Sequence, residues 1–414
     1  MAATLALLAL LLAIALSMTA RVNVGLLSMA LAWLIGVYAA GMKADAVIAG
    51  FPASLFLTLA GVTFLFSIAK SNGTLDLLAA RAAKVVKGNA GLLPIVFFVL
   101  AGVISTIGPG AIASVALVAP IAMATGMRAG VPNLLSAVMV ATGANAGNLS
   151  PISAVGAMAN TLMAKNGLAD QELVVWAANF LAHVLVAMGA YFLFGGLRLF
   201  RNSVAAVESA VVQVDRKHRL TLVVTVVWMI AAVVWRVNVG LSAFAAGTLL
   251  ILLGAANERE VIRGIPFDII FMVTGVTMLV AVLESTGGMD LFTGMIARVS
   301  SPTTINGVIA FVTGVISTYS STSGVVLPAF LPMVPGLVRQ VGGGDPLAIS
   351  LSINVGSALV DVSPLSTLGA LCVAAVSDPV AARDLFRKLL IWGLSMTIVG
   401  ALLCALFAGA FARL

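Results

Sequence analysis

The sequence predicts an all-α polytopic membrane protein built from two inverted repeats. Of its 414 residues, 61% are hydrophobic and only 9% are charged, and the mean hydropathy is +1.16, which is outside the range of soluble domains of this size. Apolar stretches of bilayer-spanning length recur along the whole chain. Short motifs of the first half also return in the second. Each repeat is therefore expected to hold five transmembrane spans and one re-entrant helical hairpin.

Composition also excludes several classes of protein. The two cysteines, Cys372 and Cys404, lie in apolar runs and indicate neither a disulfide framework nor a metal site. Two histidines are too few for an all-protein zinc cage. The formal charge of +7 is explained by membrane orientation rather than by nucleic-acid binding. The N-terminus lacks the positive region of a secretory signal peptide and is expected to form the first span.

The expected spans follow one another in the same order in both halves. In the first half they lie at 3–19, 23–42, 50–69, 131–164 and 173–197, and in the second half at 220–235, 238–255, 265–283, 347–376 and 389–411. Segments 91–127 and 303–338 are too long for one span and carry Gly, Pro, Ser and Thr at their centres, which predicts hairpins. Repeat 1 then covers 1–197, a cytoplasmic linker covers 198–219, and repeat 2 covers 220–414. Segment 71–88 has the spacing of a basic amphipathic helix at the membrane interface, with a counterpart at 286–300.

Internal similarity supports a tandem duplication. Arg21-Val-Asn-Val-Gly-Leu returns at Arg236, Gly61-Val-Thr at Gly275, and Gly102-Val-Ile-Ser-Thr at Gly314. The phrase Ser-Pro-x-Ser, preceded two residues earlier by Asn148 or Asp361, occurs once in each half. The offset stays between 212 and 215 residues. Because five spans is an odd number, the second copy must be inverted relative to the first.

The basic residues fix the expected orientation. Positive charge accumulates on the cytoplasmic side of membrane proteins, and the predicted spans place 16 of the 22 Lys and Arg residues on one face. The other face holds Lys43, Lys165, Arg236, Arg298, Arg339 and Arg413. Both termini are therefore predicted to lie on the outer, periplasmic side of the cell inner membrane.

The two hairpin tips are rich in groups that hold ions. The first tip reads Ser105-Thr-Ile-Gly-Pro-Gly110 and the second reads Ser317-Thr-Tyr-Ser-Ser-Thr-Ser323. Free helix N-termini at such tips carry partial positive charge and attract carboxylates. Hydroxyl groups add hydrogen-bond donors for an anion and oxygen ligands for a cation.

The two Ser-Pro-x-Ser phrases predict broken helices. Pro151 and Pro364 each remove a backbone donor and unwind the preceding turn, and the carbonyls set free can coordinate a hard cation. A simple proline kink explains neither the polar clustering nor the duplication. The predicted substrate-binding residues are Gly110, Asn148, Ser150, Ser153, Ser321, Thr322, Ser363, Ser366 and Thr367. The predicted metal ligands are Asn145, Asn148, Ser320, Asp361 and Ser363.

Asp361 is the acidic residue predicted to lie well inside the membrane, where a carboxylate is a functional candidate as a sodium ligand or proton carrier. No Lys or Arg occurs in either phrase or tip. A bound dianion would therefore lack a positive partner and would repel Asp361, and this conflict favours coupling to a cation. His183, beside Asn179, is expected to be packed or interfacial. An intramembrane serine protease using Ser321 or Ser363 lacks an obvious base, so no enzymatic activity is expected.

These features resemble the ion transporter superfamily, in particular the divalent anion/sodium symporters, and most of all malonate/dicarboxylate carriers of the MatC type. In the symporter family each hairpin tip carries Ser-Asn-Thr, which binds substrate carboxylate and helps to form a sodium site. Ser320-Ser321-Thr322 is similar, whereas the first tip reads Gly108-Pro109-Gly110. The resemblance implies an elevator mechanism, with a dimeric scaffold (1–90 and 220–301) and transport regions (91–197 and 302–414). It leads us to expect the stronger cation site in the second half.

The predicted function is import of a small dicarboxylate such as malonate or succinate, coupled to Na⁺ or H⁺, with no other cofactor. Two transport alternatives stay open at this stage. One is a membrane subunit of a TRAP-type dicarboxylate system, and the other is a cation/proton antiporter.

Overall fold

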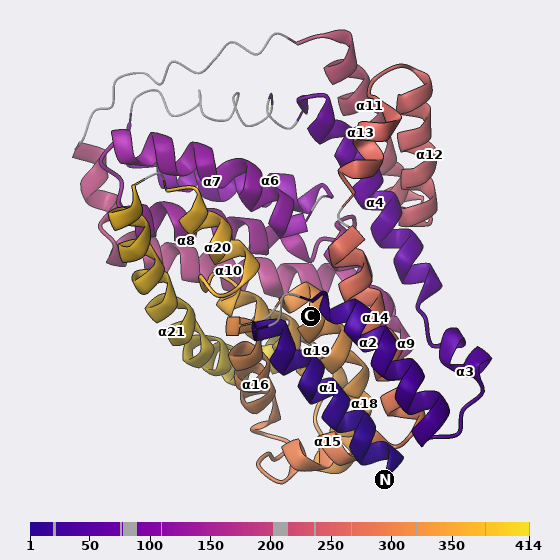
Figure 1. Cartoon of the computed structure of the whole chain (residues 1–414). Helices are drawn as coiled ribbons and strands as arrows, with labels where there is room; N and C mark the ends of the chain where they lie inside the picture. Colours follow the sequence, from indigo (N-terminus) through magenta and orange to yellow (C-terminus); the bar gives the residue numbers. More distant parts are fainter. Residues whose placement is uncertain are drawn as a thin grey trace.

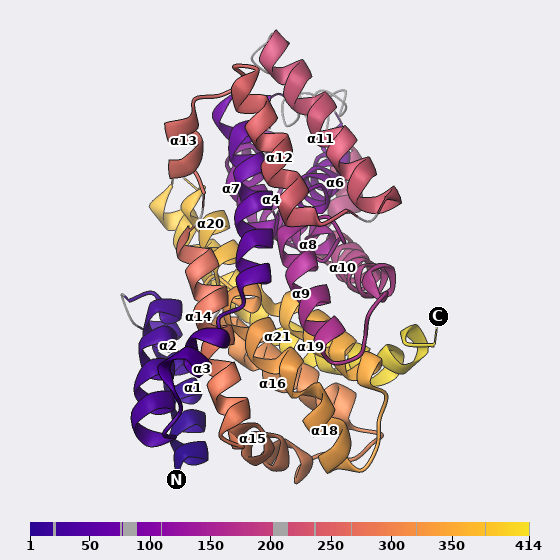
Figure 2. The same cartoon turned by 90° about the vertical axis from the view of Figure 1, so that its right-hand side faces the viewer.

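A computed structural model describes residues 1–19, 22–74, 77, 89–108, 110–201, 214–235, 237–265, 267–319, 321–376 and 378–413. The regular elements of this part of the chain are helices (Figures 1 and 2), as expected of an all-α protein. Most of the predicted interfacial helix at 71–88 and of the linker at 198–219 lies outside the described residues.

The first half begins with the helices of the expected scaffold region and continues with those of the predicted hairpin and broken helix. Its helices are α1 (Ala2–Thr19), α2 (Val24–Trp33) with the π-helical turn η1 (Leu34–Ala39), α3 (Ala44–Ala49), α4 (Ala53–Ser71), α6 (Leu92–Thr106), α7 (Gly110–Arg128), α8 (Asn133–Asn148), α9 (Ala154–Lys165), α10 (Glu172–Leu193) and the 3₁₀ turn η3 (Gly196–Arg201).

The second half of the described chain is helical as well. Its helices are α11 (Arg216–Val234), α12 (Val239–Leu252), α13 (Glu258–Arg263), α14 (Phe267–Ser285), α15 (Gly288–Ala297), α16 (Ile305–Tyr319), η4 (Thr322–Val326), α17 (Leu327–Phe330), η5 (Leu331–Met333), α18 (Val334–Val341), α19 (Pro346–Val360), α20 (Thr367–Ala374) and α21 (Pro379–Phe411).

Several helices have the length and composition of membrane spans. Among the described residues, α7, α10, the stretch Thr322–Val341 and α21 are each long and apolar enough to cross a bilayer. Shorter apolar helices of 10–17 residues include parts of α1, α4, α12 and α16. The helix bounds agree with the apolar segments identified in the sequence.

Helices of opposite halves pack backbone against backbone. A Cβ atom added to Gly275 of α14 would lie 2.1 Å from the Gly25 carbonyl oxygen of α2, and one added to Gly61 of α4 would lie 2.2 Å from the Gly240 carbonyl oxygen of α12. Gly25 and Gly240 occupy equivalent places in the repeated sequence, as do Gly61 and Gly275. The two close contacts are therefore counterparts of each other.

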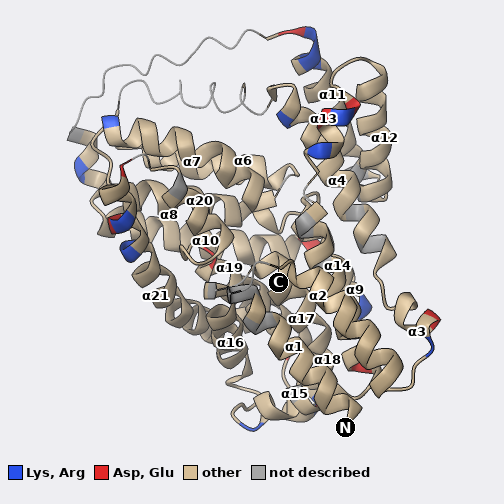
Figure 3. Ribbon diagram, in the orientation of Figure 1, with Lys and Arg blue, Asp and Glu red and all other residues tan. Residues whose placement is uncertain are grey.

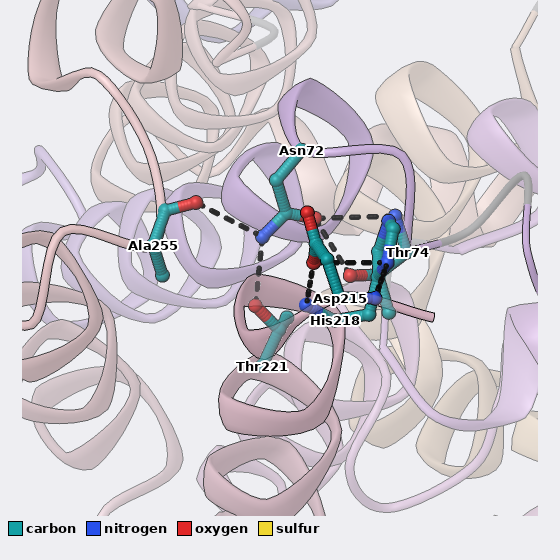
Figure 4. Close-up of polar contacts among 6 residues, drawn as sticks. All are labelled: Asn72, Thr74, Asp215, His218, Thr221 and Ala255. Carbon is teal, nitrogen blue, oxygen red and sulfur yellow. Dashed lines mark hydrogen bonds and ion pairs between the residues drawn. The ribbon is translucent and has the colours of Figure 1, made fainter. Parts of the chain in front are cut away.

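The end of α4 is tied to the start of α11 by polar groups (Figure 4). The Asn72 amide donates to Thr221 Oγ1 at 2.7 Å and to the Ala255 carbonyl at 3.3 Å, while Asn72 Oδ1 accepts from the Thr74 hydroxyl at 2.6 Å. Next to them, Asp215 and His218 form a capping box at the N-terminus of α11. The bond from the His218 backbone N–H lowers the pKa of Asp215, so the cap persists until the pH falls into the acid range.

Basic residues are unevenly distributed over the fold (Figure 3). They gather on α11 and α13 and near the start of α21, in the upper half of the view, whereas α1, α2 and α16 are nearly free of them.

Candidate functional site

The first break separates α8 from α9 over residues 149–153. Ser153 caps α9, since its Oγ accepts from the Gly156 N–H at 2.9 Å. The same hydroxyl lies 2.5 Å from the Asn148 carbonyl oxygen and 2.9 Å from that of Ser150. It therefore satisfies carbonyls that the break exposes, in a region where water is scarce.

The first hairpin tip is bound to this break. The Ser150 hydroxyl donates to the Thr106 carbonyl at 2.6 Å, and the Ala154 N–H donates to the Gly108 carbonyl at 3.2 Å. Gly108 has φ +152°, and a Cβ atom there would lie 1.6 Å from the Phe66 ring. Only glycine fits this position. Its neighbour Pro109 lies outside the described residues.

Asn148 holds the N-terminus of the second hairpin arm. Its Oδ1 accepts from the Ala111 N–H at 2.9 Å, which satisfies one of the free donors at the start of α7. Gly110, at φ +79°, lies directly against this Oδ1 atom. The structure thus brings together Asn148, Ser150, Ser153 and Gly110 at one buried junction.

The bond from Ala111 to Asn148 gives a testable prediction. Asn148→Ala leaves a buried N–H without an acceptor, and we expect it to lower the free energy of unfolding by about 1–2 kcal/mol. Asn148→Asp keeps an acceptor oxygen in the same place and is the matched control when it is measured at a pH low enough to protonate the new carboxyl group, because an ionised carboxylate there would itself cost stability. Thermal unfolding of the purified protein measures both, and equal midpoints for Asn148→Ala and the wild type would contradict the assignment.

The second break, between α19 and α20, repeats the same hydroxyl pattern. The Ser366 hydroxyl lies 2.6 Å from the Asp361 carbonyl oxygen and 2.8 Å from that of Ser363. Ser363 Oγ in turn accepts from the Leu365 N–H at 3.3 Å. Thr367 is exposed at the start of α20 and lies apart from this buried group.

Asp361 is the charged group of the second break. Its side chain is 8% exposed, and its Oδ1 atom has no hydrogen-bond partner among the described residues. The hydroxyl groups of Thr322 and Ser366 lie beside the carboxyl group. No ion pair found in the described part of the chain includes Asp361. An ionised carboxylate in such a place costs several kcal/mol, so it requires a proton or a cation.

The second hairpin tip supplies the hydroxyl groups near Asp361. Thr322 Oγ1 donates to the Ser357 carbonyl of α19 at 3.2 Å and shares a hydrogen bond with the Ser317 hydroxyl. Ser321 caps the turn, accepting from the Gly324 N–H at 3.0 Å. Ser320 lies outside the described residues. Hydroxyl, carbonyl and carboxylate oxygens are the ligands that a hard cation prefers.

The two broken helices meet one turn before their breaks. The Asn145 amide of α8 donates to the Ala358 carbonyl of α19 at 2.9 Å. Asn145 and Ala358 are separated by the same offset as Asn148 and Asp361, so equivalent positions of the repeat contact each other. The hydrogen bonds of Asn145 join it to Ala358 and Asn179, and its predicted role as a metal ligand stays a prediction.

The sequence did not assign a role to Asn179 and His183 of α10, which join this contact. The Asn179 amide donates to the Asn145 carbonyl at 2.7 Å, and His183 Nδ1 lies 2.8 Å from the Asn179 carbonyl oxygen. Their spacing of four residues puts both side chains on one face of α10. In the sequence, two polar residues on the same face of an apolar helix were the signal that could have indicated this contact.

Comparison with known proteins places this geometry in context. Residues 1–148 match the family model described as the N-terminus of the dicarboxylate carrier protein MatC. The predicted resemblance to MatC-type carriers is confirmed over this region. The MatC match ends at Asn148, at the first break. No curated protein matches the sequence.

A solved structure is similar over the whole chain. The YdaH transporter of Alcanivorax borkumensis superposes with a TM-score of 0.55 at 14% sequence identity, and the match covers 98% of each chain. At this identity the likeness is one of fold. The chain thus shares the fold of a solved transporter, and the match of residues 1–148 to a dicarboxylate-carrier family agrees with the multi-pass membrane protein that the sequence predicted.

Proposed function

We propose that this chain is a secondary active transporter that imports a small dicarboxylate of the malonate and succinate class, coupled to Na⁺ or H⁺. The description of the matching family supports the dicarboxylate, and the fold shared with YdaH supports transport. The observation that carries cation coupling is the buried Asp361 carboxyl group with its unpartnered Oδ1 atom. Thr322 and Ser366 add hydroxyl oxygens beside it.

The same proposal assigns the chain two inverted repeats and an elevator mechanism. Its support is the reciprocal packing of α2 with α14 and of α12 with α4, together with a hairpin and a broken helix in each half. In this scheme α2, α4, α12 and α14 belong to the stationary scaffold of a homodimer. The two hairpins move together with the broken helices that follow them. The basic residues of α11, α13 and α21 (Figure 3) support a cytoplasmic position for those ends.

The balance of charge at the breaks favours transport coupled to a cation over uncoupled transport of the dicarboxylate. Both breaks and the described tip residues contain no Lys or Arg. A dicarboxylate dianion brought near an ionised Asp361 would meet only negative charge and helix dipoles. A cation bound at Asp361, or its protonation, removes that repulsion and makes substrate binding depend on the ion.

Uptake by purified protein in liposomes tests this proposal. Labelled malonate, succinate and a longer dicarboxylate are supplied under an inward Na⁺ gradient, an inward proton gradient or neither. We expect accumulation of one of the short dicarboxylates under one gradient and only equilibration without a gradient. No accumulation of any dicarboxylate under either gradient would refute the proposal.

The same assay separates the two alternatives. A membrane subunit of a TRAP-type system would be inactive until a soluble binding protein is added. A cation/proton antiporter would exchange the two ions across the membrane with no dicarboxylate present.

A further inference from the structure

An apolar groove runs between α10 and α21. It consists of two adjoining hollows, a first of about 390 Å³ and a second of about 410 Å³, which share Leu185 of α10 and Leu403 of α21. Nearly all of the lining side chains are apolar. The Ser395 hydroxyl of the second hollow donates to the Trp392 carbonyl at 2.7 Å, so it is already satisfied. The groove therefore suits a hydrocarbon chain rather than a polar ligand.

The side chains of the protein leave this groove open. Gly189 lines the second hollow, and a Cβ atom added there would have no atom within 4 Å. Two other lining side chains, Leu185 and Phe407, are 51% and 48% exposed. Helices α10 and α21 are each long and apolar enough to cross a bilayer. Inside a membrane, a lipid acyl chain covers such a surface and leaves no polar group unsatisfied.

The length of the groove matches the membrane. Its lining residues on α21 extend from Trp392 to Phe411, about 28 Å along the helix axis, which is close to the roughly 30 Å thickness of the hydrocarbon core. The second hollow covers Trp392 to Leu403, about 16 Å along the same axis. It therefore has the length of one leaflet and can take an acyl chain whose headgroup lies beyond Trp392.

Basic side chains lie at this end of the groove. The Trp392 ring packs edge-on against Phe194, the residue that follows α10, with ring centroids 5.3 Å apart. Lys388 precedes Trp392 by one turn and lies on the same face of α21. A Cβ atom at Gly195 would lie 3.9 Å from Arg198 Cδ, so the Arg198 side chain lies beside the residue next to Phe194. Lys388 and Arg198 are both exposed.

The Trp392 end of the groove stays positive when its acidic groups are counted (Figure 3). The charged residues there are Arg198, Arg383, Arg387 and Lys388 against Asp378 and Asp384. Lys388 Nζ donates to Asp384 Oδ2 at 2.6 Å, which leaves two of its three N–H donors for a ligand. At the opposite end of the groove, the first turn of α10 carries Glu172 and α21 is followed by Arg413, which balance each other.

We infer that this groove binds an anionic phospholipid. One acyl chain lies along the second hollow from Trp392 toward Leu403, and Lys388 and Arg198 hold the phosphate. Basic groups between membrane-spanning helices attract anionic headgroups, whereas the ammonium group of a choline headgroup would meet charges of its own sign. The inference needs neither a dicarboxylate nor a coupling ion, so it stands apart from the proposed function.

Native mass spectrometry of the full chain tests the binding of lipid. The protein is stripped of lipid in detergent and titrated with dioleoyl phosphatidylglycerol or with dioleoyl phosphatidylcholine, which have the same acyl chains. We expect one phosphatidylglycerol per chain to bind about tenfold more tightly than phosphatidylcholine, because two basic side chains contact its headgroup. Equal affinity for the two lipids would overturn the inference.

A matched pair of glycine variants tests the position of the acyl chain. Gly189→Leu fills the second hollow without a clash, and we expect both lipids to bind at least tenfold more weakly. Gly409→Leu adds the same side chain at a glycine of α21 that also has no atom within 4 Å of the added Cβ and does not line the groove, so it should bind as wild type.

Thermal unfolding without added lipid should be the same for both glycine variants and the wild type, which separates loss of binding from loss of folding. Phosphatidylglycerol bound by Gly189→Leu as tightly as by the wild type would overturn the inference. A Gly189→Leu protein that loses a dimer instead of a lipid would assign the groove to a second copy of the chain and would equally overturn it.

A matched pair of charge variants tests the headgroup contacts. Lys388→Gln combined with Arg198→Gln should bind the two lipids with equal affinity. Arg383→Gln combined with Arg387→Gln removes the same charge from the start of α21, but these two residues lie on a face of the helix turned away from the groove, so the preference for phosphatidylglycerol should remain. An equal loss of preference in both double variants would show a general effect of positive charge and would refute the headgroup site.

Discussion

Asp361→Asn is expected to reduce gradient-driven uptake by about 100-fold or more, because it removes the buried carboxylate that needs a cation. The substitution keeps the size of the side chain and adds an amide that can donate to the carbonyls of the break. The fold should therefore survive, while the affinity for Na⁺, or the capacity to carry a proton, is lost. Initial rates of uptake in liposomes at several Na⁺ concentrations and pH values measure this effect.

Two controls sharpen the interpretation of this variant. Asp45→Asn removes the same charge from an exposed position in α3 and should leave uptake unchanged. Exchange of internal for external dicarboxylate, with no gradient imposed, reports substrate binding without net coupling. If Asp361→Asn still exchanges dicarboxylate but no longer accumulates it, Asp361 is assigned to proton transfer. If the variant loses both exchange and accumulation, Asp361 is assigned to cation binding. Accumulation with the wild-type dependence on Na⁺ and pH would remove Asp361 from the mechanism.

Gly369→Ala and Gly156→Ala are expected to disrupt the two breaks. A Cβ atom at Gly369 would lie 2.1 Å from the Ser363 carbonyl oxygen, and one at Gly156 would lie 1.9 Å from the Ser150 carbonyl oxygen. The obstructing atoms belong to the backbone and cannot rotate away. We expect a loss of about 2–3 kcal/mol of stability for each substitution and at least a matching loss of uptake, because the bonds from the Ser366 and Ser153 hydroxyls to the carbonyls of their breaks depend on this close approach.

A third helical glycine supplies the control for these two. Gly189 of α10 has no atom within 4 Å of the added Cβ position, so Gly189→Ala should be neutral or slightly stabilising through its higher helix propensity. Thermal midpoints of the three variants in detergent, measured beside their uptake, make the comparison. Gly156→Ala and Gly369→Ala proteins as stable as Gly189→Ala would contradict the close packing at the breaks.

The positions of the breaks and tips were predictable because each is marked by residues with strong local preferences. Pro151 and Pro364 cannot continue a helix, and helices α8 and α19 end at Asn148 and Val360. The repeated phrase added a second, independent signal. Conversely, Thr367 shares the sequence environment of Ser366 but is exposed, since adjacent residues at a helix start point in different directions.

The contacts between the halves were not predictable. The Asn145 amide meets Ala358 only because two helices separated by more than 200 residues end at the same place, and nothing local to either helix specifies this. For the same reason, the bond from the Asn179 amide to the Asn145 carbonyl could not be predicted. The serine hydroxyls were expected to bind ligand, and the structure shows Ser153 and Ser366 also bonded to the carbonyls of their own breaks.

The reciprocal glycine contacts have a consequence for biosynthesis. Gly25 is covered by a helix that is synthesised roughly 250 residues later, and contacts of such long sequence separation form slowly. The first half must therefore stay in the membrane with the small-residue faces of α2 and α4 unmatched until α12 and α14 have been inserted. Separately expressed halves are accordingly expected to be degraded alone and to assemble only when they are produced together.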